Sequence, residues 1–383
     1  MKSANPRSKL PKRALLATAV ASTFVATAPV QAFEATLSGQ INRIVNYIDD
    51  GVDTGLLFQD CTCTGTRFRM VGSQDVQEGW KAGGNIELQF QSNASDQTPL
   101  AGEMREEEPP FAGVRDGNVS GPSTNDGRLR KADIWISSPF GKLSLGQGDG
   151  AANGTSEHDL SDTWIASYNA PSGPGGQLLR EEGSGAAGPS VFAVTSQYDG
   201  LSRNDRIRYD TPVLGPVTFA VSAGHEFQEV AGRLFWEGGG GTQLSGGLGI
   251  VQSRPAGIDI QYNASLSILF PFGFNITGSF GERSRDPSAA TVAVGREDSD
   301  TWHLKLGWRF GANFKHAVSV AAGLDSDRRI SGEEADRLDL AYIYNFADGV
   351  KLYAGYNLVS VDSPGAVQFE DMTSIFAGGR FTF

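Results

Sequence analysis

The sequence predicts an all-β transmembrane protein, an antiparallel up-and-down β-barrel of about sixteen strands in the outer membrane of a Gram-negative bacterium. About sixteen short segments alternate apolar with polar residues, as they must when one face of a strand meets lipid and the other an aqueous lumen. The sequence contains no apolar run of the roughly 20 residues that a transmembrane helix needs. Short and long connections alternate between the segments, and an even strand number then puts both termini at the periplasmic end.

Residues 1–32 are predicted to form a cleaved secretory signal peptide. Five basic residues stand near the start, and residues 14–28 form a small-residue apolar stretch that is too short for a membrane anchor. Residues 29–32 end in alanine, the small residue that such a cleavage site requires. The mature chain is therefore expected to begin at Phe33, with residues 33–383 forming one barrel.

The strand predictions rest on a period of two residues. Between Ile258 and Ile268, for example, every even position is apolar or small, and every odd position is polar. The predicted strands are 35–48, 65–76, 80–92, 128–138, 142–149, 203–212, 216–225, 230–237, 243–252, 258–270, 272–284, 300–311, 313–325, 336–347, 350–361 and 371–383. Longer polar loops are expected at 49–64, 93–127, 150–202, 285–299, 326–335 and 362–370, and short turns between the other strands.

Aromatic residues gather near the expected strand ends, where they would form the interfacial girdles of a membrane barrel. These residues are Trp80, Phe140, Phe270, Phe272, Phe310, Phe314, Tyr342, Tyr344, Phe346, Phe381 and Phe383. Amphipathic strands of a soluble sandwich have the same local pattern. The alternation of short turns with long loops favours the barrel, because a sandwich has no reason to maintain it.

Composition excludes several classes of function. The chain has 32 basic and 44 acidic residues. Removal of the signal would leave 27 basic residues and a formal net charge of −17, so nucleic acid is not expected as a partner. The four histidines are scattered and no nucleophile motif occurs, so we expect no enzyme, catalytic residue, metal or cofactor. Cys61 and Cys63 lie in the first long loop, and a local loop staple or two incidental thiols are favoured over a metal or redox pair.

Several motifs, in their order and spacing, resemble strands of the Gram-negative general porins. These are residues 37–43 (LSGQINR), 49–51 (DDG), 66–73 (TRFRMVGS), 141–148 (GKLSLGQG) and 204–212 (NDRIRYDTP), together with the terminal Phe383. The resemblance implies a sixteen-stranded, usually homotrimeric, water-filled channel whose third loop, here 150–202, folds inward as a constriction loop. It also implies that Phe383 is an assembly signal for the barrel-assembly machinery, and that the first strand lies at the trimer contact, with Leu37, Gly39, Ile41 and Val45.

Strand periodicity predicts which basic residues face the lumen. Outward Phe68 and Met70 turn Arg67 and Arg69 inward. On the sixth strand, Arg206 and Arg208 are likewise inward, opposite Ile207 and Tyr209. On the fourth strand, outward Ile134 and Ile136 turn Lys131 inward and Arg130 outward, but a bulge could swap them. The resemblance places a basic residue of this strand at the constriction without deciding between Arg130 and Lys131.

The expected acidic side of the constriction is Asp149, before the third loop, with Glu157, Asp159 and Asp162 inside it. Arginines facing carboxylates across a narrow passage would create a transverse field that sets ion preference. The predicted function is passive diffusion of ions and small hydrophilic solutes, with a weak cation preference suggested by the net charge. Outer-membrane lipid and lipopolysaccharide are the expected surroundings. The alternatives are a substrate-specific channel and a plugged barrel that acts as an adhesin or structural tether.

Overall fold

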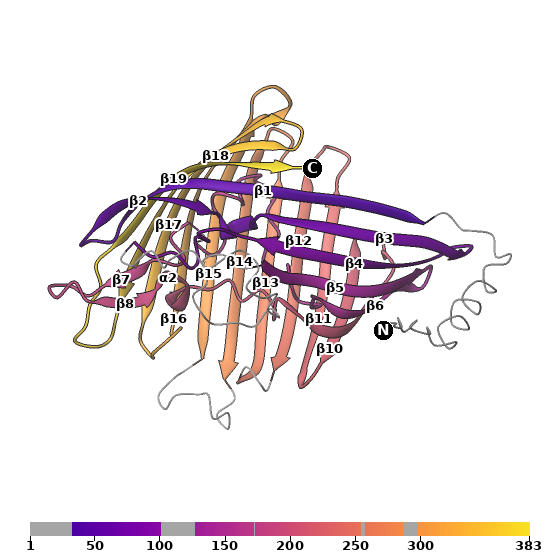
Figure 1. The fold of residues 1–383 in the computed structure, drawn as a ribbon, viewed down its shortest axis with the longest axis horizontal. Coiled ribbons are helices and arrows are strands. Elements are labelled where there is room, and N and C mark those ends of the chain that lie inside the picture. Colours follow the sequence, from indigo (N-terminus) through magenta and orange to yellow (C-terminus); the bar gives the residue numbers. More distant parts are fainter. Residues whose placement is uncertain (1–32, 101–126, 172, 254–256, 286–297) are drawn as a thin grey trace, which may run out of the picture. The chain divides into compact units, whose positions relative to one another are not determined.

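The computed structural model describes residues 33–100, 127–171, 173–253, 257–285 and 298–383, so the predicted signal peptide lies outside the described residues. Sixteen antiparallel strands pair side by side into a closed ring, which confirms the predicted fold (Figure 1). In ring order they are β1 (Glu34–Asp49), β3 (Arg67–Gln77), β4 (Trp80–Phe90), β5 (Gly127–Ser138), β6 (Gly141–Asp149), β9 (Arg203–Asp210), β10 (Val217–Gly224), β11 (Phe227–Glu237), β12 (Gln243–Ser253), β13 (Ile258–Leu269), β14 (Phe274–Arg285), β15 (Ser299–Phe310), β16 (His316–Ser326), β17 (Glu334–Ala347), β18 (Val350–Asp362) and β19 (Met372–Thr382). Each coincides with one predicted strand to within three residues at either end.

The ring closes where β1 pairs with β19. Residues Gln40 to Asp49 of β1 pair in register with Thr382 to Thr373 of β19. At the end of this seam, the Gly39 amide donates to the Phe383 carbonyl at 2.8 Å, and the Phe383 amide donates back at 3.0 Å. Closure satisfies the backbone groups that an open sheet edge would leave unpaired in lipid.

The second strand position of the ring is filled by two pieces, which corrects the prediction of a polar loop over residues 49–64. Strand β2 (Thr54–Asp60) pairs with the second half of β1, and β3 pairs with the first half. The short 3-10 helix η1 (Thr62–Thr64) joins the two pieces. Strand β2 forms because Leu56 and Phe58 alternate with Leu57 and Gln59, so the exposed side chains are apolar like those of the other strands.

The strands are apolar on the outside and polar on the inside. On β15, the side chains of Trp302, Leu304 and Trp308 are more than half exposed, whereas His303 and Lys305 are buried. This pattern is opposite to that of a soluble protein, which buries its apolar residues. It fits a ring whose outer face meets lipid and whose inner face meets water and the third loop. Among the described residues, no helix is long and apolar enough to cross a membrane.

Aromatic side chains form a band at the short-turn end of the ring, as predicted from the sequence. Phe270 stacks on Phe272 and Phe274 in the turn between β13 and β14. Ring contacts then continue across the next strands, from Trp308 and Phe310 through His316 and Tyr344 to Phe346. Phe140 in the turn between β5 and β6 is 74% exposed, as expected of a side chain that inserts into a membrane interface.

The third loop, residues 150–202, is more structured than the sequence prediction of a polar loop. It contains the hairpin β7 (Leu178–Arg180) and β8 (Ala187–Ser190) and the short helix α2 (Val191–Val194). Its apolar residues Leu179, Val191 and Val194 are buried against inward-facing residues of the wall, including Ile48, Val359 and Met372. These wall residues belong to β1, β18 and β19, and other loop residues hydrogen-bond to Ser222 of β10, Glu229 of β11 and Ser265 of β13. The loop therefore follows the wall from β10 round to β1, and the large remaining cavity lies toward β3, β5 and β9.

Replacing Gly39 by alanine is expected to destabilise the barrel by about 1–3 kcal/mol, the usual cost of overpacking. A Cβ atom at this position would lie 2.6 Å from the Phe383 ring and 2.8 Å from the Arg67 carbonyl oxygen. Gly239, where a Cβ would meet nothing within 4 Å, provides the matched control. Urea unfolding of both variants in detergent, followed by tryptophan fluorescence, measures the difference. Equal midpoints for Gly39→Ala and Gly239→Ala would show that the seam tolerates the added methyl group.

Candidate functional site

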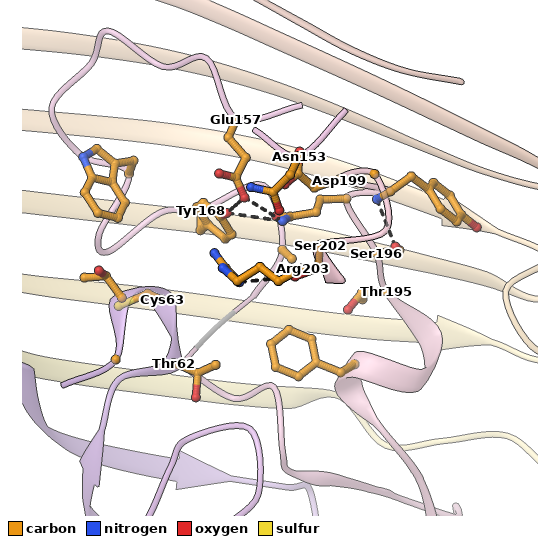
Figure 2. A pocket seen from close by; sticks show the side chains of 18 of the residues that line it. Thr62, Cys63, Asn153, Glu157, Tyr168, Thr195, Ser196, Asp199, Ser202 and Arg203 are labelled. Carbon is orange, nitrogen blue, oxygen red and sulfur yellow. Dashed lines mark hydrogen bonds between the residues drawn. The ribbon is translucent and has the colours of Figure 1, made fainter. Parts of the chain in front are cut away.

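The open side of the lumen contains a cavity of about 770 Å³ between the wall and the third loop. The wall contributes Arg67 from β3, Arg130 from β5 and Arg203 at the start of β9. The loop contributes Glu157, Asp159, Tyr168 and Asp199. Figure 2 shows Arg203 in this cavity together with Glu157, Tyr168 and Asp199 of the loop and with Thr62 and Cys63 of the β2–β3 connection. Four residues predicted for the constriction therefore line the same cavity: Arg67, Arg130, Glu157 and Asp159.

A β-bulge resolves the orientation of the fourth predicted strand, β5. The register with β4 shifts between the pairs Glu87–Lys131 and Leu88–Leu129, so Arg130 is the extra residue. Its guanidinium group contacts the buried Glu87 carboxylate at 2.6 Å and the Gln89 side-chain carbonyl at 2.8 Å. Because the bulge reverses the alternation, both Arg130 and Lys131 face the lumen. Regular periodicity turned Lys131 inward and Arg130 outward; the bulge, which the sequence left open, keeps Lys131 inside and brings Arg130 inside as well.

A second cavity, of about 410 Å³, brings together the other predicted wall residues. It is lined by Arg69, Lys131, Asp149, Arg206 and Arg208, with Asp133, Lys142 and Asp210. Arg206 is nearly buried, since it ion-pairs with Asp133 at 2.8 Å and donates to the Gly146 carbonyl at 2.8 Å. Arg208 donates to the Gly150 carbonyl at 2.7 Å. These two arginines therefore fix the strand end from which the third loop departs.

Two of the predicted acidic residues anchor the third loop to the wall. Asp159 forms a buried ion pair with Lys305 of β15 at 2.7 Å. Burial alone raises the pKa of Asp159, but the Lys305 ammonium group and hydrogen bonds from Ser161 outweigh burial and hold the pKa below its usual value. Asp162 pairs with Lys351 and accepts a hydrogen bond from Asn345 at 2.7 Å. Within the described residues, Asp162 lies in neither cavity lining.

Asp149 also forms ion pairs within the barrel wall. It belongs to β6 rather than to the loop, and it ion-pairs with Lys131 and, at 2.9 Å, with Arg203. Arg203 was not predicted as a lumen residue, because alternation from Arg206 and Arg208 would turn it outward. Asp149 and Arg203 face each other where β6 ends and β9 begins. Strict alternation fails at such strand ends, so periodicity could not have found this pair.

Glu157 and Asp199 form a carboxyl pair on the loop side of the large cavity. Burial, together with the neighbouring Asp199 charge, raises the pKa of Glu157 to about 8. Burial also raises the pKa of Asp199, although hydrogen bonds from the Gly154 amide at 2.7 Å and the Ser156 hydroxyl at 2.9 Å favour its charged form and oppose this shift. Glu157 accepts from the Tyr168 hydroxyl and the Gln197 amide. At neutral pH the Glu157 carboxyl group is therefore protonated.

Cys61 and Cys63 form a disulfide beside the large cavity. The connection that they close positions Thr64, whose hydroxyl accepts a hydrogen bond from Arg67 at 3.1 Å. Gln40 donates to the Thr64 carbonyl at 2.7 Å, which holds the same turn against β1. Among the described residues, no group of three or more histidine, cysteine, aspartate or glutamate side chains is arranged to hold a metal ion.

Comparison with known proteins points to one family and one architecture. A family profile described as Gram-negative porin matches residues 14–363. The fold is similar to that of an anion-selective porin from Comamonas acidovorans, with a TM-score of 0.58, 16% identity, and coverage of 92% of this chain and 100% of that one. It is also similar to OmpT of Vibrio cholerae in a trimer form (TM-score 0.56, 12% identity, 92% and 100% coverage). The outer membrane channel DcaP of Acinetobacter baumannii is similar too (TM-score 0.54, 14% identity, 93% and 100% coverage). A search of curated proteins found no match.

Proposed function

Because the chain belongs to the Gram-negative porin family, an assignment that indicates an outer-membrane channel rather than an enzyme, we propose that it passes ions and small hydrophilic solutes passively down their gradients. The observation that carries this proposal is the polar inner face of the ring together with the charged cavity beside the third loop. Sixteen strands are wide enough to leave an aqueous channel. The third loop, held against one wall, would narrow this channel to a constriction.

The local charges favour anions at the constriction. In the part of the chain that the structure describes, the large cavity is lined by six arginines and three acidic residues. Asp159 is paired with Lys305, and Glu157, whose pKa is raised to about 8, is protonated at neutral pH. The lining therefore carries less negative charge than its three acidic residues would give. Fixed charges at a narrow passage outweigh the net charge of the whole chain in setting ion preference. We therefore propose an anion preference, and the weak cation preference expected from net charge stays as the competing prediction.

Self-association is the second part of the proposal. Leu37, Ile41 and Val45 of β1 are exposed on the outer face, and Gly39 lies between them. A homotrimer that covers this apolar stripe would remove it from contact with lipid. The similar Vibrio cholerae protein is described in a trimer form, which supports the proposal. Signal cleavage before Phe33, contact with lipopolysaccharide, and recognition of Phe383 by the barrel-assembly machinery remain predictions from the sequence.

The test is single-channel recording of refolded residues 33–383 in a planar bilayer under a potassium chloride gradient. Stable conductance steps are expected, with a reversal potential of the sign that a chloride preference produces. A reversal potential of the opposite sign would support the competing cation preference. If a correctly folded, heat-modifiable barrel gave no conductance, the channel proposal would be wrong, and a plugged barrel would replace it.

The anion preference is expected to fall as pH rises through about 8. Glu157 holds a proton below this pH, because its pKa is raised, and it adds a negative charge to the cavity lining above it. The charged neighbours that face it are Asp199 and Arg203, and arginine does not titrate in this range. Reversal potentials from pH 6 to pH 9 measure the effect. Glu157→Gln should keep the low-pH preference throughout, and an unchanged pH response in this variant would assign the titration to another group.

A further inference from the structure

The large cavity has an aromatic side as well as a basic one. Trp164, Tyr168 and Phe192 of the third loop are half-buried, and all three line the cavity that also contains Arg67, Arg130 and Arg203. Inorganic anions such as chloride gain nothing from contact with the faces of such rings, which carry partial negative charge. A passage built only for ions would therefore be expected to have polar residues at these positions, and the aromatic side calls for another explanation.

The rings are held in place by the protein. The Arg380 guanidinium group lies 5.3 Å from the centre of the Trp164 ring, a cation–π arrangement. Trp164 also packs, with Cys63, against a buried apolar cluster that contains Ile44 and Ile165. The Tyr168 hydroxyl is anchored to Glu157 and Gln197. Rings that are already fixed lose little entropy when a ligand packs against them, so this side of the cavity is preorganised.

The arginines of the wall are fixed in the same way. Arg67 is oriented by Thr64, Arg130 by Glu87 and Gln89, and Arg203 by Asp149. Each of these contacts uses only some of the guanidinium nitrogens. Within the described residues, Arg67 and Arg130 each retain at least one nitrogen with no protein partner. The planar guanidinium group matches the geometry of a carboxylate, so these groups can bind a carboxylate that enters the cavity.

We infer that this cavity is a binding site for aromatic carboxylates, small anions of the benzoate class, on their way through the channel. The carboxylate would bind the wall arginines, and the ring would pack against Trp164 and its aromatic neighbours in an offset or edge-on arrangement. A cavity of about 770 Å³ lies within the range of small-molecule sites, about 300–1,000 Å³. Acetate would use only the arginines and benzyl alcohol only the rings. This inference rests on the proposed channel function and specifies its preferred solute.

The test is block of the chloride current of the whole mature chain in a planar bilayer by benzoate, acetate and benzyl alcohol. Benzoate is expected to reduce or interrupt the current at a concentration about fivefold lower than acetate, the order of effect expected of one aromatic ring pair. Benzyl alcohol should have no effect at these concentrations. Equal block by benzoate and acetate, with normal chloride conductance, overturns the inference and leaves the channel proposal intact. Absence of any chloride conductance overturns both.

Variants assign the effect to the site. Trp164→Leu and Phe192→Leu should each reduce the benzoate-to-acetate ratio toward one, with the block by both anions measured relative to the chloride current of the same variant. Trp302→Leu, on the outer face where the indole is 55% exposed, is the matched control and should leave the ratio unchanged. A ratio that is retained in both loop variants, or lost in the Trp302 control, contradicts the assignment. Two separate loop variants guard against one that fails to fold.

Discussion

Replacing Arg67 by glutamate is expected to reverse the ion preference of the channel or to abolish it. Arg67 lines the large cavity, and its described contacts include no ion pair that would neutralise its charge. The substitution therefore changes the charge of the lining by two units. Even at the dielectric constant of bulk water, unit charges about 4 Å apart interact by about 1 kcal/mol. The anion-to-cation permeability ratio should therefore fall by at least about fivefold.

The measurement is the reversal potential under a potassium chloride gradient. Arg67→Gln should give about half the change, because it removes one charge unit rather than two. Arg43→Glu is the matched control, since Arg43 lies on the neighbouring strand β1 with an exposed, outward position and the same change of charge. If Arg43→Glu shifted the reversal potential as much as Arg67→Glu, the selectivity would come from the overall field rather than from the cavity.

Replacing Lys305 by methionine is expected to release the third loop from its wall. The ammonium group contacts the Asp159 carboxylate and the Ser167 carbonyl, and its side chain is only 2% exposed. Removal of one partner from a buried ion pair leaves the other charge without compensation, at a cost of about 3–5 kcal/mol. Because the wall strands retain their backbone hydrogen bonds, the loop rather than the ring should yield. We expect a larger and noisier single-channel conductance and a lower unfolding midpoint.

The double variant Asp159→Asn with Lys305→Met separates a charge effect from a packing effect. It removes both charges, so no buried carboxylate is left unpaired, and its stability and conductance should lie closer to those of the parent protein. Additive effects of the two substitutions would instead mean that Asp159 and Lys305 act independently. In that case the loop would depend on its other anchors, such as the 2.8 Å hydrogen bond from Arg337 to the Asn169 carbonyl.

The strands themselves were predictable because their signal is local. On β15, the apolar residues Trp302, Leu304 and Leu306 alternate with the polar residues His303 and Lys305. This alternation predicts which face of the strand meets lipid. Alternation also turned Arg67 and Arg69 toward the lumen, where each lines a cavity. It failed at the β5 bulge, where one extra residue brings Arg130 inside, and at the β6–β9 strand ends, where Asp149 meets Arg203. The apolar positions of β5 change from odd at Leu129 to even at Ile134 and Ile136, but a single apolar residue before the bulge is too little to fix its position from sequence.

The sequence by itself determined the barrel, its strand number, the inward face of most strands and the residue types available to the lumen, because these follow from a period of two residues and from connection lengths. Only the tertiary structure decided how the charges are paired. Asp159 and Asp162 were expected to face the arginines, yet they hold the third loop to Lys305 and Lys351, more than 140 residues away in sequence. Such partners are set by the packing of the loop inside the ring, which depends on all sixteen strands at once. The sign of the charge at the passage follows from this pairing and not from composition.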